Sequence, residues 1–311
     1  MIKNFSLAIH GGAGTLLRGQ MTPAKEQEYT TALQQALDAG HAVLSKAGSA
    51  LDAVEAAVRM LEDCPLFNAG RGSVFTADGT HQMDASIMEG RTRNAGAVSL
   101  ITGIRNPIAL ARDVMEKSNH VFLAGDGAMH FAQSLGYVVE PPSYFHNDLR
   151  HKQWLDLRDS EAFQLDHSDK KDSKFGTVGA VACDVHGNLA AATSTGGMTN
   201  KKWGRVGDSP MIGAGTYANN ATCAISCTGS GEFFIRGVVA YDVSCLMEYR
   251  GLSLADAAHE VIQNRVQQLG GDGGLIAVDA QGNIAMPFNT EGMYRGFVTS
   301  TGKTEIAIYR P

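Results

Sequence analysis

Three threonines in the second half of the chain lie in or beside glycine-rich turns: Thr177 in GTVG, Thr195 in STGGM and Thr228 in TGSG. A threonine hydroxyl is a weak nucleophile at neutral pH and needs a base beside it. Thr177 differs from the other two because a polar run, KKDSK, ends just before GTVG. An apolar, alternating run follows it, so the simplest interpretation is a turn glycine that opens a strand. The alternative is that Thr177 becomes a new N-terminus.

Cleavage of the bond between Gly176 and Thr177 would supply the missing base. The freed α-amine has a reference pKa of about 7.7–8.0 and lies within reach of its own hydroxyl. The same hydroxyl can make the cut by attacking the Gly176 carbonyl, since a residue without Cβ lets the attacking group approach closely. We therefore predict self-cleavage into residues 1–176 and 177–311, with a flexible tail over about 140–176.

A second pair of residues, Arg205 and Asp208 in GRVGDSP, could bind a small zwitterion. The head group of an α-amino acid carries one anion and one cation. An arginine fork matches the carboxylate, and an aspartate accepts hydrogen bonds from the ammonium. Arg-x-x-Asp is also common as a surface pair, but its place just after the STGGM turn favours a ligand site.

Hydrophobic periodicity predicts the elements that position these residues. Helices are expected at residues 24–47, 49–61, from 107 onward, 232–249 and 253–269. Strands are expected at residues 5–10, 73–75, 80–89, 95–102, 178–185, 189–195, 211–216, 222–228, 275–278 and 284–288. Hairpins between helices predict antiparallel sheets covered by helices rather than a βαβ repeat. Residues 139–176 lack strong periodicity, although residues 148–165 could carry a short helix.

Composition narrows the functional classes. The 311 residues suit one large domain, and the net charge of −6 argues against nucleic acid as a partner. The first residues resemble no signal peptide and no apolar run is long enough to span a membrane, so a cytoplasmic location is expected. Five cysteines without a CxxC pair predict buried thiols. HGGAGT lacks the ending of a phosphate-binding loop, which disfavours a non-catalytic nucleotide-binding protein.

Motifs along nearly the whole chain resemble a known family. They are LAIHGGAG, SALDAVEAAVRMLEDCPLFNAGRGSVFT, RNPIALARDVME, FGTVGAVACDVHGNLAAATSTGGMTNK, GRVGDSPMIGAG, CTGSGE, GGLIAVD and PFNTEGMYR, in that order. This pattern is similar to the plant-type asparaginases, or isoaspartyl peptidases, which are N-terminal-nucleophile hydrolases. The resemblance implies an α+β fold, a four-layer αββα sandwich that forms a single domain over residues 1–311. It also implies a heterotetramer of two α and two β chains, and no organic cofactor.

The resemblance further implies roles for the threonines. Thr177 matches the nucleophile, and Thr195 matches the threonine that hydrogen-bonds it. Thr228 and Gly229 match the oxyanion hole, which also contacts the substrate. The implied substrates are β-amides of aspartate, either L-asparagine or a β-aspartyl dipeptide. A β-aspartyl ester of the nucleophile would form and water would release L-aspartate. A glycosylasparaginase-like activity on the same fold is the nearest alternative.

The same resemblance implies residues that hold the substrate. Arg205 and Asp208 match the pair that binds the α-carboxylate and α-ammonium, and Gly231 lies at the same ligand. Asn68 is expected to face the pocket. Lys202-Trp203 departs from the proline-containing stretch expected in bacterial relatives, which leaves the preference between substrates open.

The segment LEDCPLFNAG, residues 61–70, resembles a loop that holds a structural sodium ion through backbone carbonyls. On this resemblance the ligands are the carbonyl oxygens of Leu61, Glu62, Cys64, Phe67, Ala69 and Arg71. A helix that ends and turns at Pro65 would account for the same residues without a metal. Arg71 stands where a smaller or apolar residue is more usual.

Overall fold

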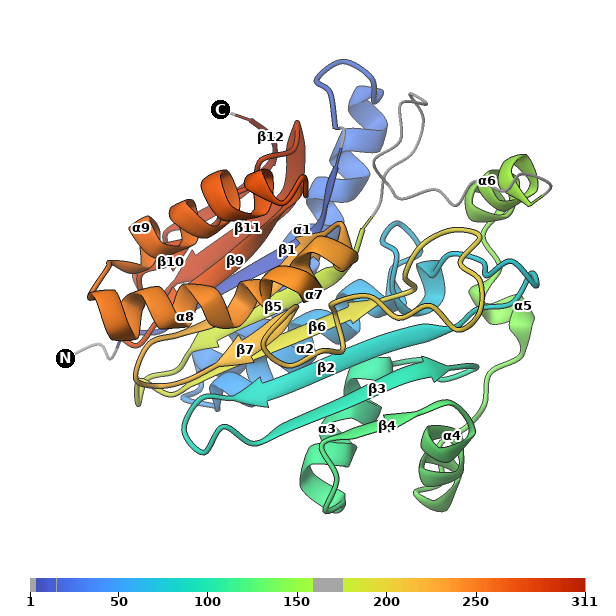
Figure 1. Cartoon of the computed structure of the whole chain (residues 1–311), viewed down its shortest axis with the longest axis horizontal. Coiled ribbons are helices and arrows are strands. Elements are labelled where there is room, and N and C mark those ends of the chain that lie inside the picture. The colour runs from blue at the N-terminus through green and yellow to red at the C-terminus, as the bar shows by residue number, and fades with distance from the viewer. Residues whose placement is uncertain (1–3, 15, 159–175, 311) are drawn as a thin grey trace.

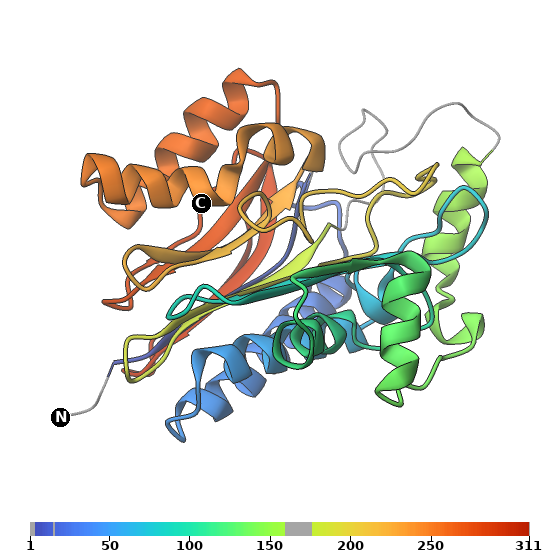
Figure 2. The same ribbon diagram turned by 60° about the horizontal axis from the view of Figure 1, so that its bottom comes forward.

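Two β-sheets pack face to face, and helices cover the outer side of each (Figures 1 and 2). The computed structural model describes residues 4–14, 16–158 and 176–310. The larger sheet has the strand order β12-β11-β1-β5-β6-β2-β3-β4 and the smaller β10-β9-β8-β7. Within the described residues, only the β3–β4 pair is parallel. This αββα arrangement confirms the predicted fold class.

The elements have the following bounds. The strands are β1 Ser6–Gly14, β2 Met83–Glu89, β3 Ala95–Ile101, β4 Phe122–Ala124, β5 Val178–Cys183, β6 Leu189–Thr195, β7 Thr216–Ala218, β8 Cys223–Gly229, β9 Gly273–Asp279, β10 Ile284–Ala285, β11 Gly292–Thr299 and β12 Thr304–Tyr309. The helices are α1 Pro23–Leu44, α2 Ala50–Asp63, η1 Gly70–Gly72, α3 Pro107–Lys117, α4 Gly125–Ser134, α5 Pro142–Phe145, α6 Asp148–Leu157, α7 Gly231–Gly237, α8 Val239–Arg250, α9 Leu254–His259 and η2 Glu260–Val266.

The central strands of the large sheet are buried on both faces, which is why β5 and β6 are so uniformly apolar. Side chains alternate along a strand, so Leu7 and Ile9 of β1 pack under α1 and α2 while Ala8 faces the smaller sheet. The same alternation sends Ala180 of β5 toward the helices and Val181 toward the second sheet. Two apolar clusters result, one under α1–α3 and one between the sheets and under α7–α9.

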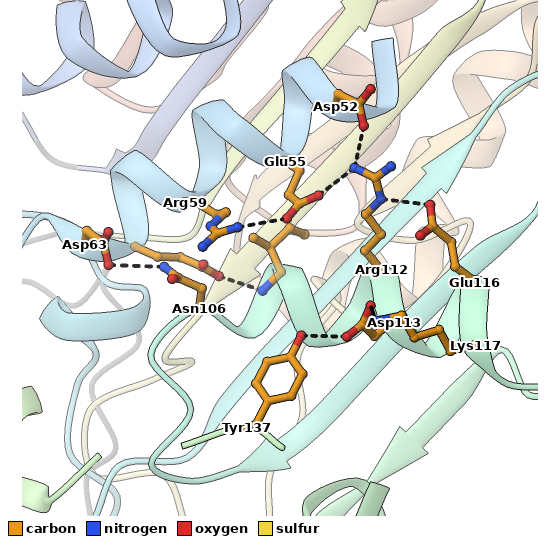
Figure 3. A network of polar contacts seen from close by, with 12 residues as sticks. Asp52, Glu55, Arg59, Asp63, Asn106, Arg112, Asp113, Glu116, Lys117 and Tyr137 are labelled. Atoms are coloured by element: carbon orange, nitrogen blue, oxygen red, sulfur yellow. Dashed lines mark hydrogen bonds and ion pairs between the residues drawn. The ribbon is translucent and has the colours of Figure 1, made fainter. Parts of the chain in front are cut away.

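Helices α2 and α3 are joined by a network of ion pairs (Figure 3). Arg112 of α3 contacts Asp52 and Glu55 of α2, both at 2.7 Å, and Glu116 of its own helix at 2.8 Å. At the end of α2, Asp63 binds Arg105 through both carboxylate oxygens, at 2.9 and 3.1 Å. These contacts fix the position from which the chain enters the loop after Asp63.

Several predicted elements differ in the structure. Residues 73–75 do not form a strand because the side chain of Asn68 takes the Val74 N–H, at 3.0 Å, which a neighbouring strand would need. The strand predicted at 211–216 is mostly turn, and β7 begins only at Thr216. The helix predicted at 232–249 breaks at Val238, whose φ of 48° is left-handed, into α7 and α8. Strand β4 and helix α4 were not predicted.

The segment predicted to lack regular structure begins with two short helices, α5 and α6, and α6 matches the short helix expected there. Asn147 caps α6 by accepting from the Leu149 N–H at 3.0 Å, and it donates to the Pro65 carbonyl at 3.1 Å. Residues 159–175, which include the polar run before Gly176, lie outside the described residues, so the predicted flexibility stays a prediction. In the part of the chain that the structure describes, no helix combines the length and the apolar character that a membrane span requires.

Candidate active site

Hydroxyl side chains gather at one end of the layer between the two sheets. Along β6, the face that presents Ala191 to the apolar cluster continues with Thr193 and Thr195. Along β8, the face of Ala224 continues with Ser226 and Thr228. The alternation of side chains along the strands therefore makes the middle of the layer apolar and its end polar. The predicted nucleophile lies at this polar end.

Thr177 immediately precedes β5, and its hydroxyl contacts two others. Its Oγ1 donates to Thr195 Oγ1 at 3.1 Å and lies 3.3 Å from Ser209 Oγ. Thr195 Oγ1 also accepts from the Gly197 N–H at 3.0 Å, which holds it in place. The predicted partnership of Thr177 and Thr195 is therefore present in the geometry of the uncleaved chain.

A cavity of about 30 Å³ lies beside Thr177. Its described lining residues are Ala13, Gly176, Thr177, Thr195, Gly197, Met198, Arg205, Gly207, Asp208, Ser209, Thr228 and Gly229. Seven of the predicted site residues thus meet at one cavity. A space of this size holds about one water molecule, far less than an amino acid. Gly176 is part of its wall, so departure of the segment before Thr177 would enlarge it.

The peptide bond predicted to break lies between two glycine-containing segments. A Cβ added to Gly12 would lie 2.6 Å from the Gly176 nitrogen, and one added to Gly176 would lie 3.0 Å from Thr228 Oγ1. Thr228 Oγ1 also accepts from the Ala13 N–H at 3.3 Å. Gly229 is needed for packing, because a Cβ there would lie 2.4 Å from the Asp272 carbonyl oxygen. Of the two predicted oxyanion residues, Thr228 therefore lies against the peptide bond predicted to break, and Gly229 lines the same cavity.

Arg205 and Asp208 face one point in space. A Cβ added to Gly231 would lie 3.0 Å from both Arg205 Nη2 and Asp208 Oδ1. A side chain at this position would cover both charged groups, and glycine leaves them open to a ligand. Glu232 holds the other edge of the Arg205 guanidinium, by Nε–Oε1 and Nη2–Oε2 contacts of 2.8 and 2.9 Å. Arg205 is thereby oriented, and its Nη1 nitrogen, which faces Gly207, has no hydrogen-bond partner among the described residues.

Asp208 is fully buried, and burial raises the pKa of its carboxyl to about 7. The Arg205 charge opposes this rise in pKa, and the Glu232 charge adds to it. Its Oδ2 atom has no hydrogen-bond partner among the described residues. A buried carboxylate without a donor is costly, so this oxygen is suited to receive a cationic ligand group.

Asn68 is buried and does not line the cavity. Its amide nitrogen donates to the Gly197 carbonyl at 2.7 Å, and its backbone carbonyl accepts from the Gly196 N–H at 3.0 Å. It therefore supports the glycine turn that holds Thr195 rather than facing the cavity as expected. Lys201, also buried, donates to the Gln82 carbonyl at 2.7 Å beneath the same turn. Trp203 is 93% exposed in a tight turn next to Arg205.

The loop after α2 offers oxygen atoms rather than charged ligands. A Cβ added to Gly70 would lie 2.4 Å from the Glu62 carbonyl oxygen, and one added to Gly72 would lie 2.0 Å from that of Phe67. The Leu61 and Cys64 carbonyls accept only long hydrogen bonds, of 3.3 and 3.5 Å. No cluster of three or more His, Cys, Asp or Glu side chains suited to a metal occurs in the described ranges. Neutral carbonyl oxygens fit a hard monovalent cation.

Sequence reasoning missed three residues at this site. Ser209 touches Thr177 directly, and Glu232 orients Arg205. His10 donates to the Thr177 carbonyl through Nδ1 at 3.0 Å, and burial lowers the pKa of its imidazole to about 3. The only sequence signals were their positions inside the motifs DSP, GSGE and HGGAG. All five cysteine thiols are free. Cys183, Cys223 and Cys227 are buried as predicted, whereas Cys64 and Cys245 are only partly buried.

Comparison with known proteins matches this chain to the asparaginase family over residues 3–308. An isoaspartyl peptidase of Escherichia coli is 54% identical over 308 residues, which cover 98% of this chain and 96% of that protein. A putative isoaspartyl peptidase/L-asparaginase of Dictyostelium discoideum is 47% identical over 96% of this chain and 94% of its own length. A plant-type L-asparaginase of Pyrococcus furiosus is 43% identical over 94% and 96%.

The αββα sandwich is the fold of the N-terminal-nucleophile hydrolases, the class to which asparaginases of this type belong. The chain belongs to the asparaginase family, because the match spans nearly its whole length.

Proposed function

We propose that this protein is an isoaspartyl peptidase with L-asparaginase activity, which becomes active by cutting itself between Gly176 and Thr177. Support comes from the names of its relatives and from the geometry beside Thr177. The observation that carries the proposal is that Thr177, Arg205 and Asp208 line one cavity. Gly231 has no side chain to cover the two charged groups, since a Cβ there would lie 3.0 Å from both Arg205 Nη2 and Asp208 Oδ1. An arginine and an aspartate side by side suit the carboxylate and the ammonium of an aspartyl group. The substrate is therefore a β-amide of aspartate.

In the proposed reaction, the α-amine of Thr177 takes the proton of the Thr177 hydroxyl as Oγ1 attacks the side-chain carbonyl of the substrate. Thr195 holds Oγ1 in position. The Thr228 hydroxyl and the Gly229 N–H stabilise the negative charge that develops on the attacked oxygen, and one such donor typically contributes about 3–4 kcal/mol. Collapse of the intermediate releases ammonia or an amino acid and leaves a β-aspartyl ester, which water then hydrolyses.

The same arrangement predicts that the uncleaved chain is inactive. Gly176 lines the cavity, whose volume of about 30 Å³ is too small for an aspartyl group. In addition, the nitrogen of Thr177 is an amide in the uncleaved chain and cannot accept a proton. Cleavage removes both obstacles at once, because it frees the amine and lets Gly176 leave.

The test of this function is release of L-aspartate from a β-aspartyl dipeptide and from L-asparagine, measured beside an α-aspartyl dipeptide of the same composition. We expect release from both β-linked substrates and none from the α-linked control, because its side-chain carboxylate offers no amide to Thr177. A glycosylated asparagine serves as the third substrate. Faster turnover of that substrate would favour the glycosylasparaginase alternative, and release from none of them would refute the proposed activity.

We also propose that the loop of residues 61–71 holds one structural sodium ion by the carbonyl oxygens named above. The ion would supply only positive charge that keeps the loop closed, with no part in the chemistry. We expect the melting temperature to rise by a few degrees when choline chloride is replaced by sodium chloride at constant ionic strength. Gly70→Ala should abolish the difference, because its methyl group would lie against the Glu62 carbonyl. Equal melting temperatures in both salts would refute a sodium site.

The assembly of two α and two β chains and the cytoplasmic location belong to the same proposal. They rest on the resemblance to the family and on the sequence alone.

A further inference from the structure

A chain of buried hydroxyls connects the backbone of Thr177 to its side chain through the layer between the sheets. Hydrogen bonds link, in order, His10 Nε2 to Ser226, Ser226 to Thr193, Thr193 to Thr216, Thr216 to Ser86, and Ser86 to the carbonyl of Ser209. All of these side chains are at most 1% exposed. Gly179 makes room for the chain, because a Cβ there would lie 2.0 Å from Ser226 Oγ.

The imidazole of His10 determines where the protons lie. Burial keeps this ring neutral, so one nitrogen donates and the other accepts. Nδ1 lies 3.0 Å from the Thr177 carbonyl oxygen, which can only accept, so Nδ1 carries the hydrogen. Nε2 must therefore accept, and the Ser226 hydroxyl, 2.9 Å away, must donate to it.

The direction of this hydrogen bond determines the direction of the following ones in the chain of buried hydroxyls. Because the Ser226 hydroxyl donates its only hydrogen to His10, it must accept a hydrogen bond from Thr193, 2.7 Å away. Thr193 in turn accepts from Thr216. The Ser86 hydroxyl then donates at the far end, to the Ser209 carbonyl at 2.6 Å or to Thr216 at 2.8 Å. Ser209 is thus anchored by its backbone, and no hydrogen of this chain is directed at its side-chain hydroxyl.

The Ser209 hydroxyl has one partner among the described residues, Thr177 Oγ1 at 3.3 Å. Thr177 donates its own hydrogen to Thr195. Its Oγ1 can therefore only accept from Ser209, whose hydrogen has no other acceptor among the described hydrogen bonds. The geometry therefore leaves the Ser209 hydroxyl as a donor to the oxygen that attacks the substrate and later leaves it.

We propose that Ser209 is a catalytic residue that assists departure of Thr177 Oγ1 when the β-aspartyl ester is hydrolysed. The inference rests on the proposed function. In this step, water adds to the ester carbonyl carbon and gives its proton to the Thr177 amine. The bond from that carbon to Oγ1 then breaks, and its electron pair goes to Oγ1. The hydrogen bond from Ser209 stabilises this charge until the amine returns the proton to Oγ1. Ser209 keeps its own proton throughout.

A hydrogen-bond donor to Oγ1 affects the rates of ester formation and ester hydrolysis differently. It stabilises Oγ1 as a leaving group, but it does not help Oγ1 as a nucleophile, because it occupies a lone pair. Loss of Ser209 should therefore slow ester hydrolysis and spare ester formation. When hydrolysis of an intermediate becomes slower, kcat and KM fall together and kcat/KM is preserved. A general disturbance of the site would instead lower kcat/KM.

The test compares Ser209→Ala with the wild-type enzyme on a β-aspartyl dipeptide. We expect kcat and KM each to fall about 10- to 100-fold with kcat/KM nearly unchanged. Acid-quenched samples should show the chain that begins at Thr177 heavier by one aspartyl group, and leaving-group release should show a burst. Ser209→Thr should restore fast hydrolysis. Ser244→Ala is the matched control. Ser244 lies in α8, and its hydroxyl is as buried as that of Ser209 and likewise hydrogen-bonds one other hydroxyl, that of Thr222.

Three results would overturn the inference: a fall in kcat/KM equal to the fall in kcat, no bound aspartyl group, or unchanged kcat. If Ser209→Ala fails to cut itself, Ser209→Cys supplies the comparison, because a thiol is a weak donor and should give an intermediate slowing. Failure of the proposed function has a different signature, since the wild-type enzyme would then release no aspartate at all.

Discussion

The Thr177→Ala variant is expected to remain a single chain of 311 residues and to release no aspartate from any substrate. Alanine lacks the hydroxyl that attacks Gly176 and the substrate, so both reactions stop together. The wild-type protein should give two bands on a denaturing gel, one of which begins with the sequence TVGAV. N-terminal sequencing of the smaller band identifies the bond that breaks.

Thr222→Val is a control for loss of a buried threonine hydroxyl. Thr222 lies outside the candidate site, and its hydroxyl hydrogen-bonds that of Ser244 at 2.7 Å. This variant should still cut itself, because the attacking hydroxyl remains. A Thr177→Ala protein that still separates into two chains would show that another group makes the cut. A wild-type protein that stays whole but hydrolyses β-aspartyl dipeptides would separate catalysis from self-cleavage.

The Asp208→Asn variant is expected to lose affinity for the substrate and to gain stability. Its amide carries no charge to pair with the α-ammonium, and loss of a buried charged partner costs about 2–4 kcal/mol of binding. KM should therefore rise about 30- to 1000-fold. Stability should increase because the wild-type carboxylate is buried with Oδ2 unpartnered among the described residues.

The stability difference should depend on pH in a defined direction. The pKa of Asp208 rises from 3.8 to about 7 in the folded chain, mainly through burial, so the folded state binds the proton more tightly than the unfolded state. Its contribution to stability is fully present below pH 3.8 and is lost as the pH rises through 7. The melting temperature of Asp208→Asn should therefore exceed that of the wild type increasingly from pH 4 to pH 7, and the difference should then level off.

Binding of the product L-aspartate should show the complementary dependence. Below about pH 7 the Asp208 carboxyl is neutral in the free enzyme, so the inhibition constant of L-aspartate should rise as the pH falls. In Asp208→Asn this dependence should be absent. A melting difference that does not change with pH, or equal inhibition profiles for the two proteins, would contradict an elevated pKa at Asp208.

Much of the fold follows from local pattern. Helical periodicity over α2 and the alternation along β5 and β6 predicted these elements because such patterns depend on residues close in sequence. The errors lie where a distant side chain competes for the backbone. Val74 was predicted in a strand, but its N–H bonds to the Asn68 side chain. The break at Val238 arises in a left-handed residue that apolar periodicity does not reveal.

The sequence by itself determined the chemistry that is available: a threonine after glycine, two further threonines in glycine turns, and an arginine–aspartate pair. Local pattern placed each at the end of a strand or in a turn. Only the tertiary structure decided that Thr177 has Ser209 on its hydroxyl and His10 on its carbonyl, 32 and 167 residues away along the chain. The physical reason is that a hydrogen bond between sheets depends on register and sheet packing. A single hydroxyl or imidazole in the sequence carries no sign of its distant partner.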